Sequence, residues 1–177
     1  MSLTRLAFTT LAALPLATGV LMAQLQKEEI AGIRNFTKVD ATVGCAGATE
    51  VAAIPEIAKR GYKSILNLRL ENERGNDLAA SKAAAEASGM TYIHLPFNGS
   101  EPDPKVADAF IAAVADTANQ PVFIHCGSAN RVGALWLAKR MLVDKWDEAR
   151  AVEEAKAIGL SSEALQAFAL EYVRSKG

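Results

Sequence analysis

The feature that most constrains the fold is the alternation of short apolar segments with longer amphipathic segments after Thr42. Three segments have the length and the β-branched or aromatic content of buried strands: 63–69, 91–96 and 121–125. Segments typical of helices lie before, between and after them, at 50–60, 77–88, 102–118, 131–143, 146–157 and 161–175. This order predicts a single α/β domain, with a mainly parallel central sheet flanked by helices and a helical C-terminus.

The first 23 residues do not follow this pattern. Arg5 precedes an apolar run that extends to Ala23, and the chain turns polar at Gln24. These features predict a secretory signal peptide over residues 1–23, cleaved after Ala23, with an uncleaved membrane anchor as the alternative. We therefore expect the protein to be periplasmic or secreted, or else anchored with its domain outside the cytoplasm. Residues 24–42 are then a lead-in to a domain over 43–177.

Composition limits the partners that this chain can recognise. Half of its 177 residues are apolar and its net charge is −1, so no excess of basic charge favours nucleic acid or an anionic membrane. A membrane is expected as a partner only if the N-terminal segment stays uncleaved. The two cysteines and two histidines do not fall at the spacing of metal ligands. We therefore predict no metal site, and no cofactor motif is present.

The stretch from His125 to Arg131 follows directly on the third predicted strand and leads into a helix. In a parallel sheet this is the edge at which ligands bind. Small side chains allow the backbone N–H groups of such a loop to converge on an anion, and the N-terminus of the next helix adds further donors. Besides Cys126 and Arg131, we expect the anion-binding loop to comprise Gly127, Ser128, Ala129, Asn130 and Val132.

Cys126 lies in a setting that favours a thiolate over a thiol, because the loop N–H groups, the helix dipole and Arg131 all stabilise negative charge. The alternative for a lone cysteine at a strand end is a small buried core residue. Because a histidine, small loop residues and an arginine coincide here, we interpret Cys126 as a catalytic nucleophile.

The loop resembles the signature loop of the cysteine-dependent protein tyrosine and dual-specificity phosphatases, in which His-Cys, five residues and Arg follow one another. More widely, residues 43–160 are similar to the bacterial beta-lactamase-hydrolase-like family of phosphatase-like domains. The matching pieces are GCAGAT at 44–49, GYKSILNLR at 61–69, GMTYIH at 89–94 and the Cys126 loop. The resemblance implies a phosphatase-like fold and hydrolysis of a small phosphoester through a covalent adduct on Cys126.

Loop length departs from the phosphatase pattern, because only four residues separate Cys126 from Arg131. The compact loop is also similar to that of rhodanese-type sulfurtransferases. A shorter loop offers fewer N–H groups and a narrower bowl, which favours a persulfide sulfur over a phosphoryl group. A sulfurtransferase that takes sulfane sulfur onto Cys126 therefore remains the alternative function, and a non-catalytic anion-binding module is the second alternative.

The general acid is the second departure. Phosphatases of this kind use an Asp on the loop after the preceding strand to protonate the leaving oxygen, but Asn98 stands there. Glu101 and Asp103 are the candidate replacements, although Asp103, between two prolines, is better interpreted as a helix N-terminal residue. Sulfur transfer needs no such acid.

Other residues are expected at the same rim. Arg69 ends a predicted strand, so we expect it either to contact a substrate anion or to pair with Glu71 or Glu73, as in an ordinary charged loop. Asn98 and His125 are further candidate substrate contacts. Cys45 lies near a strand end and is a candidate resolving thiol for Cys126, with a small buried residue as the alternative.

Overall fold

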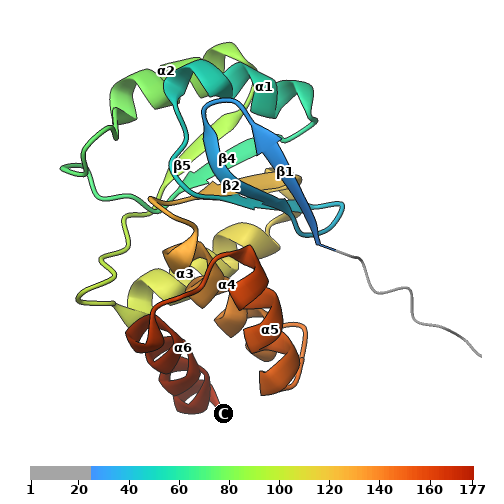
Figure 1. Cartoon of the computed structure of the whole chain (residues 1–177), viewed down its shortest axis with the longest axis vertical. Coiled ribbons are helices and arrows are strands. Elements are labelled where there is room, and N and C mark those ends of the chain that lie inside the picture. Colours follow the sequence, from blue (N-terminus) through green and yellow to red (C-terminus); the bar gives the residue numbers. More distant parts are fainter. Residues whose placement is uncertain (1–24) are drawn as a thin grey trace, which may run out of the picture.

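The computed structural model describes residues 25–177, so the expected signal peptide or anchor lies outside the described residues. The described chain forms a single α/β domain of three layers, with a six-stranded sheet between two sets of helices (Figure 1). The sheet has the order β1-β2-β3-β6-β4-β5. Its strands are β1 (Gln26–Ile30), β2 (Ile33–Lys38), β3 (Val43–Ala46), β4 (Ser64–Asn67), β5 (Thr91–His94) and β6 (Val122–His125).

The parallel part of the sheet consists of β3, β6, β4 and β5. Strand β6 is central to it, with Ile124 paired to Cys45 of β3 on one side and to Leu66 of β4 on the other. All three segments predicted as strands are present, and the predicted fold class is confirmed. The carboxyl ends of the four parallel strands meet at one edge, and the Cys126 loop leaves the sheet there.

Two antiparallel strands occupy the segment that the sequence presented only as a lead-in. β1 pairs with β2 and β2 pairs with β3, so residues 26–38 extend the sheet. β1 (QKEEI) is almost entirely exposed, so it shows no apolar alternation. Charged residues on an exposed edge strand oppose pairing with another chain. In β2 the alternation is broken at Asn35, which has a positive φ of 51°.

Helices cover both faces of the sheet (Figure 1). α1 and α2 lie over the face that carries Phe36, Ile65 and Phe123, whereas α3 to α6 lie over the face that carries Leu66, Ile124 and Cys126. The helices are α1 (Ile54–Lys59), α2 (Leu78–Ala87), α3 (Pro104–Ala115), α4 (Asn130–Leu142), α5 (Glu148–Ile158) and α6 (Glu163–Lys176). The predicted helix over 50–60 begins instead with a 3-10 turn, Val51–Ala53.

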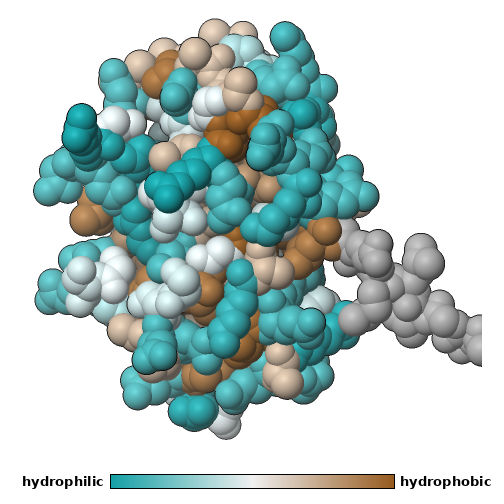
Figure 2. Space-filling model, viewed as in Figure 1, coloured by the Kyte–Doolittle hydropathy of each residue, from teal (hydrophilic) through white to brown (hydrophobic). Residues whose placement is uncertain are grey.

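The surface shows no large apolar area on the face drawn in Figure 2, where hydrophobic residues form small separate groups among hydrophilic ones. Val143 is the one large hydrophobic side chain that is exposed within residues 25–177. In the same residues, no helix has both the length and the apolar character that crossing a membrane requires.

Candidate active site

Cys126 follows the last residue of β6 and lies at the base of the loop that leads into α4. Its backbone N–H donates to the carbonyl oxygen of Ala46 at 3.3 Å, and its side chain is fully buried. Successive side chains of a strand point to opposite faces, so Cys126 faces α3 to α6 and His125 faces α1 and α2. The loop therefore begins with its thiol on the side of α4.

The carbonyl groups of the loop are held by neighbours outside it. Ala48 N–H donates to the Gly127 oxygen at 3.0 Å, and Nδ2 of Asn35 donates to the Ser128 oxygen at 3.4 Å. Ala129 adopts a left-handed conformation with φ 73°, which turns the chain into α4, and its carbonyl accepts from Gly133 at 2.9 Å. This arrangement is the one expected when the N–H groups of the same loop converge on an anion.

Arg131, in the first turn of α4, reaches across the carboxyl edge of the sheet. Its Nη1 donates to the carbonyl oxygens of Leu68 at 3.2 Å and Phe97 at 3.0 Å. The guanidinium also forms a bidentate pair with Glu73, at 2.6 Å from Nη1 and 2.9 Å from Nη2. Nη2 lies 3.4 Å from the position of an added Cβ at Gly127. The guanidinium is therefore fixed beside the Cys126 loop.

Glu73 is shared by two arginines, because Arg69 Nε donates to its Oε2 at 3.1 Å. Although burial opposes ionisation, the hydrogen bonds from Arg131, Leu70 N–H and Arg69 lower the pKa of Glu73 to about 2. Burial also opposes the charge of Arg131, but its bond to Glu73 and the nearby Cys126 raise the pKa of that arginine above its ordinary value. The cluster carries one more positive than negative group, which suits an oxyanion or a thiolate.

The pairing of Arg131 with Glu73 was not predicted. Arg69 was expected to pair with Glu71 or Glu73, and Glu73 is its partner. The other donors of Arg69 bond to carbonyl oxygens, Nη1 to Gly75 at 3.0 Å and Nη2 to Arg74 at 2.6 Å. Nε, Nη1 and Nη2 of Arg69 therefore all bond to the loop after β4, and these bonds fix that loop.

Two residues of the expected anion-binding loop have other contacts. Asn130 Oδ1 accepts from the N–H groups of Ser161 at 3.1 Å and Ser162 at 3.2 Å, so its side chain ties the loop to the start of α6. The side chain of Val132 is fully buried in the core. These residues contribute to the loop through the backbone of the first turn of α4.

The loop after β5 is pinned against Arg131 at two points around Asn98. The Phe97 carbonyl accepts from Arg131, and a Cβ added at Gly99 would lie 3.5 Å from Arg131 Cγ. Glu101 is exposed, and Asp103 accepts from Lys105 N–H at 2.9 Å, which caps α3. The structure therefore gives Asp103 the helix-capping position, as the flanking prolines favoured.

His125 and Cys45 are both buried beneath the rim. Burial first, and then Arg69 and Arg131, lower the pKa of His125 to about 3, so the imidazole is neutral. It lies beside Phe123, on the face of the sheet opposite Cys126, so it is not placed to contact a substrate held by the Cys126 loop. Cys45 is a free, fully buried thiol one strand away from Cys126. Burial raises its pKa well above the ordinary value, with Glu154 and Asp40 adding to the effect, and this opposes a resolving thiolate.

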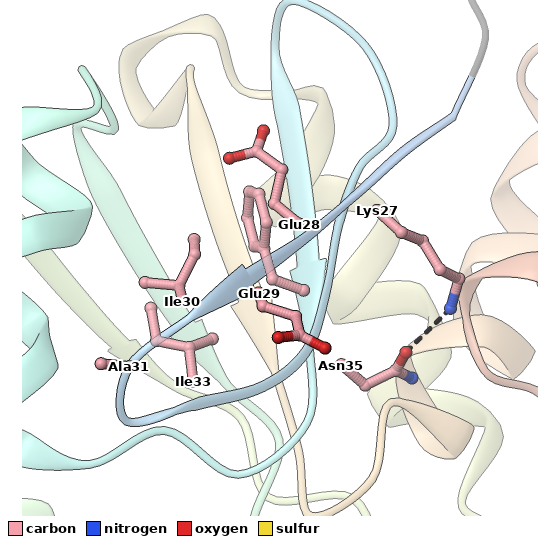
Figure 3. Close-up of a pocket in the computed structure, with 8 residues that line it drawn as sticks. Lys27, Glu28, Glu29, Ile30, Ala31, Ile33 and Asn35 are labelled. Carbon is pink, nitrogen blue, oxygen red and sulfur yellow. Dashed lines mark hydrogen bonds between the residues drawn. The ribbon is translucent and has the colours of Figure 1, made fainter.

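A depression lies along the hairpin of β1 and β2 (Figure 3). Its volume is about 760 Å³, and it is lined by Lys27, Glu28, Glu29, Ile30, Ala31, Ile33, Asn35 and Phe36. Lys27 Nζ donates to Asn35 Oδ1 at 2.8 Å, as drawn in Figure 3. Opposite charges are mixed in this groove, and its lining contains neither a thiol nor an arginine.

The fold and the loop define a phosphatase-like domain with a cysteine at the carboxyl edge of a parallel sheet. Residues 35–143 match the family of the phosphatase-like domain of beta-lactamase hydrolase-like proteins, and the chain belongs to this family. A beta-lactamase hydrolase-like protein of Xylella fastidiosa is 30% identical over 132 residues, which cover 71% of this chain. The chain spans only 30% of that relative's length.

Solved structures with a similar fold include phosphatases. The catalytic core of the PP-IP phosphatase SIW14 from S. cerevisiae, in complex with citrate, superposes with a TM-score of 0.70 at 20% identity, covering 81% of this chain and 88% of that one. P. aeruginosa TpbA in complex with phosphotyrosine superposes with a TM-score of 0.64 at 18% identity, covering 85% and 88%. At these identities the likeness establishes the fold alone.

Proposed function

We propose that this domain is a cysteine-dependent phosphatase that hydrolyses phosphomonoesters. Cys126 attacks phosphorus, a phosphocysteine forms, and water releases phosphate in a second step. The loop N–H groups and Arg131 bind the phosphoryl oxygens and stabilise the charge on them. Family membership supports this function over the sulfurtransferase alternative, which the similar structures do not favour.

The observation that carries the proposal is the fixed position of Arg131. Two carbonyl groups and both oxygens of Glu73 hold its Nη1 and Nη2 beside Gly127. The bidentate pair occupies the edge of the guanidinium formed by Nη1 and Nη2, and a hydrogen bond to Cys126 places the group against the nucleophile. A planar guanidinium held in this way binds a phosphoryl group with little loss of rotamer entropy. A non-catalytic anion-binding module would not require a nucleophile beside it.

The test uses two substrates in parallel. Purified protein is incubated with p-nitrophenyl phosphate, and separately with thiosulfate and cyanide, with Cys126→Ser as the control. We expect nitrophenol release from the wild type, a phosphocysteine in the intact mass after acid quenching, and loss of both in the variant. Thiocyanate without nitrophenol would establish the sulfurtransferase instead. Activity retained by Cys126→Ser would refute the assignment of the nucleophile.

For the cellular location, we propose export with cleavage after Ala23, on the basis of the apolar N-terminal run. The intact mass of the protein from a periplasmic or culture fraction is the measurement. A mature chain that begins at Gln24 is expected. A full-length chain in the membrane fraction would establish the anchor.

A further inference from the structure

The loop after β5 offers an amide where cysteine phosphatases of this kind carry their proton donor. Asn98 stands between Phe97 and Gly99, both of which lie against Arg131. Its Oδ1 accepts from Ser100 N–H at 3.1 Å, and its carbonyl accepts from Glu101 N–H at 3.2 Å, so the turn is closed on itself. An amide donates hydrogen bonds but cannot transfer a proton at neutral pH.

None of the carboxyl groups around this turn is held at the Cys126 loop in a protonated form. Asp103 caps α3, and Glu101 is exposed beyond the turn. Glu73 lies beside Arg131 but is ionised between two arginines, so it holds no proton to give. His94 directs Nε2 to the carbonyl oxygen of Arg69 at 2.8 Å.

The anchoring of the turn opposes a rearrangement that would bring a carboxyl group inward. Phe97 is fully buried and packs against Phe168 of α6, with 5.7 Å between ring centroids. Leu165 of the same helix lies 3.7 Å from an added Cβ at Gly99. The main chain on both sides of Asn98 is thus fixed by α6 and by Arg131.

From this geometry we infer that the enzyme cleaves phosphate esters of acidic hydroxyl groups, such as phenols, and discriminates against alkyl phosphates because no side chain protonates the leaving oxygen; the inference rests on the proposed function. The Cys126 sulfur forms a bond to phosphorus while the bond from phosphorus to the ester oxygen breaks. The electron pair of the broken bond leaves on that oxygen, which takes over the negative charge of the thiolate. The leaving anion then takes a proton from water.

The stability of the leaving anion therefore sets the rate of the first step. A phenol, with a pKa of about 10, is a far better leaving group than the hydroxyl of serine. General acid catalysis contributes about 10²- to 10⁴-fold in enzymes that use it. Without an acid, the rate falls most for the esters whose leaving oxygen is most basic.

The experiment measures kcat/KM for p-nitrophenyl phosphate, phenyl phosphate and phosphoserine, with wild type, Asn98→Asp, Glu101→Gln, Asp103→Asn and His94→Asn. We expect the wild type to prefer p-nitrophenyl over phenyl phosphate by at least about 10²-fold, the size of the missing contribution, and to turn over phosphoserine more slowly still. Glu101→Gln and Asp103→Asn should leave these ratios unchanged. Asn98→Asp should reduce the preference and add a loss of activity at alkaline pH, where the new acid is deprotonated.

Equal kcat/KM for p-nitrophenyl and phenyl phosphate in the wild type would overturn the inference even if Asn98→Asp failed to fold. So would a preference that increases in Glu101→Gln, in Asp103→Asn or in His94→Asn, because that residue would then be the missing acid. Absence of both phosphate release and a phosphocysteine adduct with all three substrates would instead refute the proposed function. Formation of the phosphocysteine adduct with p-nitrophenyl phosphate therefore distinguishes a failure of the leaving-group inference from a failure of the proposed function.

Discussion

The two ends of α4 each carry a largely buried arginine, and the two arginines are held in different ways. Arg131, in the first turn, shares one carboxylate with Arg69. Arg140, in the last turn, pairs with Glu154 at 2.6 Å, Asp144 at 2.8 Å and Asp40 at 3.5 Å. The first cluster has an excess of positive charge, whereas carboxylates outnumber the arginine in the second.

The surroundings of the two guanidinium groups differ as well. Arg140 lies over the rings of Trp136 and Trp146, at 4.6 Å and 4.3 Å from their centroids. Nε and both terminal nitrogens of Arg140 bond to carboxylates. The Arg131 cluster instead borders a loop of small residues and a cysteine. One helix thus carries an arginine whose charge is outweighed by carboxylates and another that shares a single carboxylate with Arg69, so positive charge is left over beside the cysteine loop.

Substituting alanine at each arginine tests this contrast most directly. Arg131→Ala should reduce kcat/KM for p-nitrophenyl phosphate by about 10²- to 10³-fold, because a fixed oxyanion donor is removed. The loss of stability should be modest, since Glu73 keeps Arg69 as its partner. Steady-state kinetics and urea unfolding of the same preparation measure both effects. If Arg131→Ala kept wild-type activity, the assignment of Arg131 to the active site would be wrong.

Arg140→Ala is the matched substitution at the other end of the helix. It should destabilise the fold by about 3–5 kcal/mol, because the largely buried carboxylate of Glu154 loses its 2.6 Å bond to Arg140, whereas Asp144 keeps Lys139 as its partner. We expect kcat/KM of the folded protein to be unchanged. A drop in kcat/KM at temperatures where the variant is fully folded would contradict the division of roles.

Glu73→Gln tests whether the Glu73 carboxylate positions Arg131. The variant should lose about tenfold to a hundredfold in kcat/KM, because a small displacement of a binding group is costly. A carboxyl with a lowered pKa stabilises the fold above its ordinary value of 4.5, and the contribution disappears as the pH falls towards about 2. Wild type should lose this stability in that window, and Glu73→Gln should not. Unfolding titrations from pH 5 to pH 2 show the difference.

We expect burial of His125 to make the stability of the fold depend on pH without affecting catalysis. Its pKa is lowered to about 3 in the fold, while the unfolded chain protonates near 6.5. The unfolded state therefore binds one more proton between these values, and the free energy of unfolding decreases by about 1.4 kcal/mol for each pH unit below 6.5. In His125→Asn this slope should vanish between pH 6.5 and 5, where the carboxyl groups still contribute little. An unchanged slope would show that the imidazole is not buried.

The smallest expected effect concerns the cap of α3. Asp103→Ala should cost about 1 kcal/mol of stability through loss of the bond to Lys105 N–H. The pH dependence of kcat/KM should match that of the wild type, because the carboxyl group serves the helix. Loss of the alkaline limb of that profile would identify Asp103 as an acid.

The sequence predicted the parts of the molecule that depend on local patterns. The three apolar segments became β4, β5 and β6, and the small-residue loop after β6 placed Cys126 and Arg131 at the sheet edge. β1 was not predicted as a strand, because its side chains are solvated on both faces and show no apolar alternation. The Arg131–Glu73 pair joins residues 58 positions apart, and nothing in their local patterns marks a contact that only the packing of β4 against β6 creates.

The bonds from Asn130 to Ser161 and Ser162 have a consequence for any attempt to isolate the family-matched part of this chain. That match ends at residue 143, yet the first residue of α4 is tied to residues 161 and 162, and α4 packs on both α5 and α6. A fragment cut at residue 143 would lose these ties and expose the apolar side of α4. The last two helices are therefore part of the smallest unit in which the cysteine loop keeps its shape.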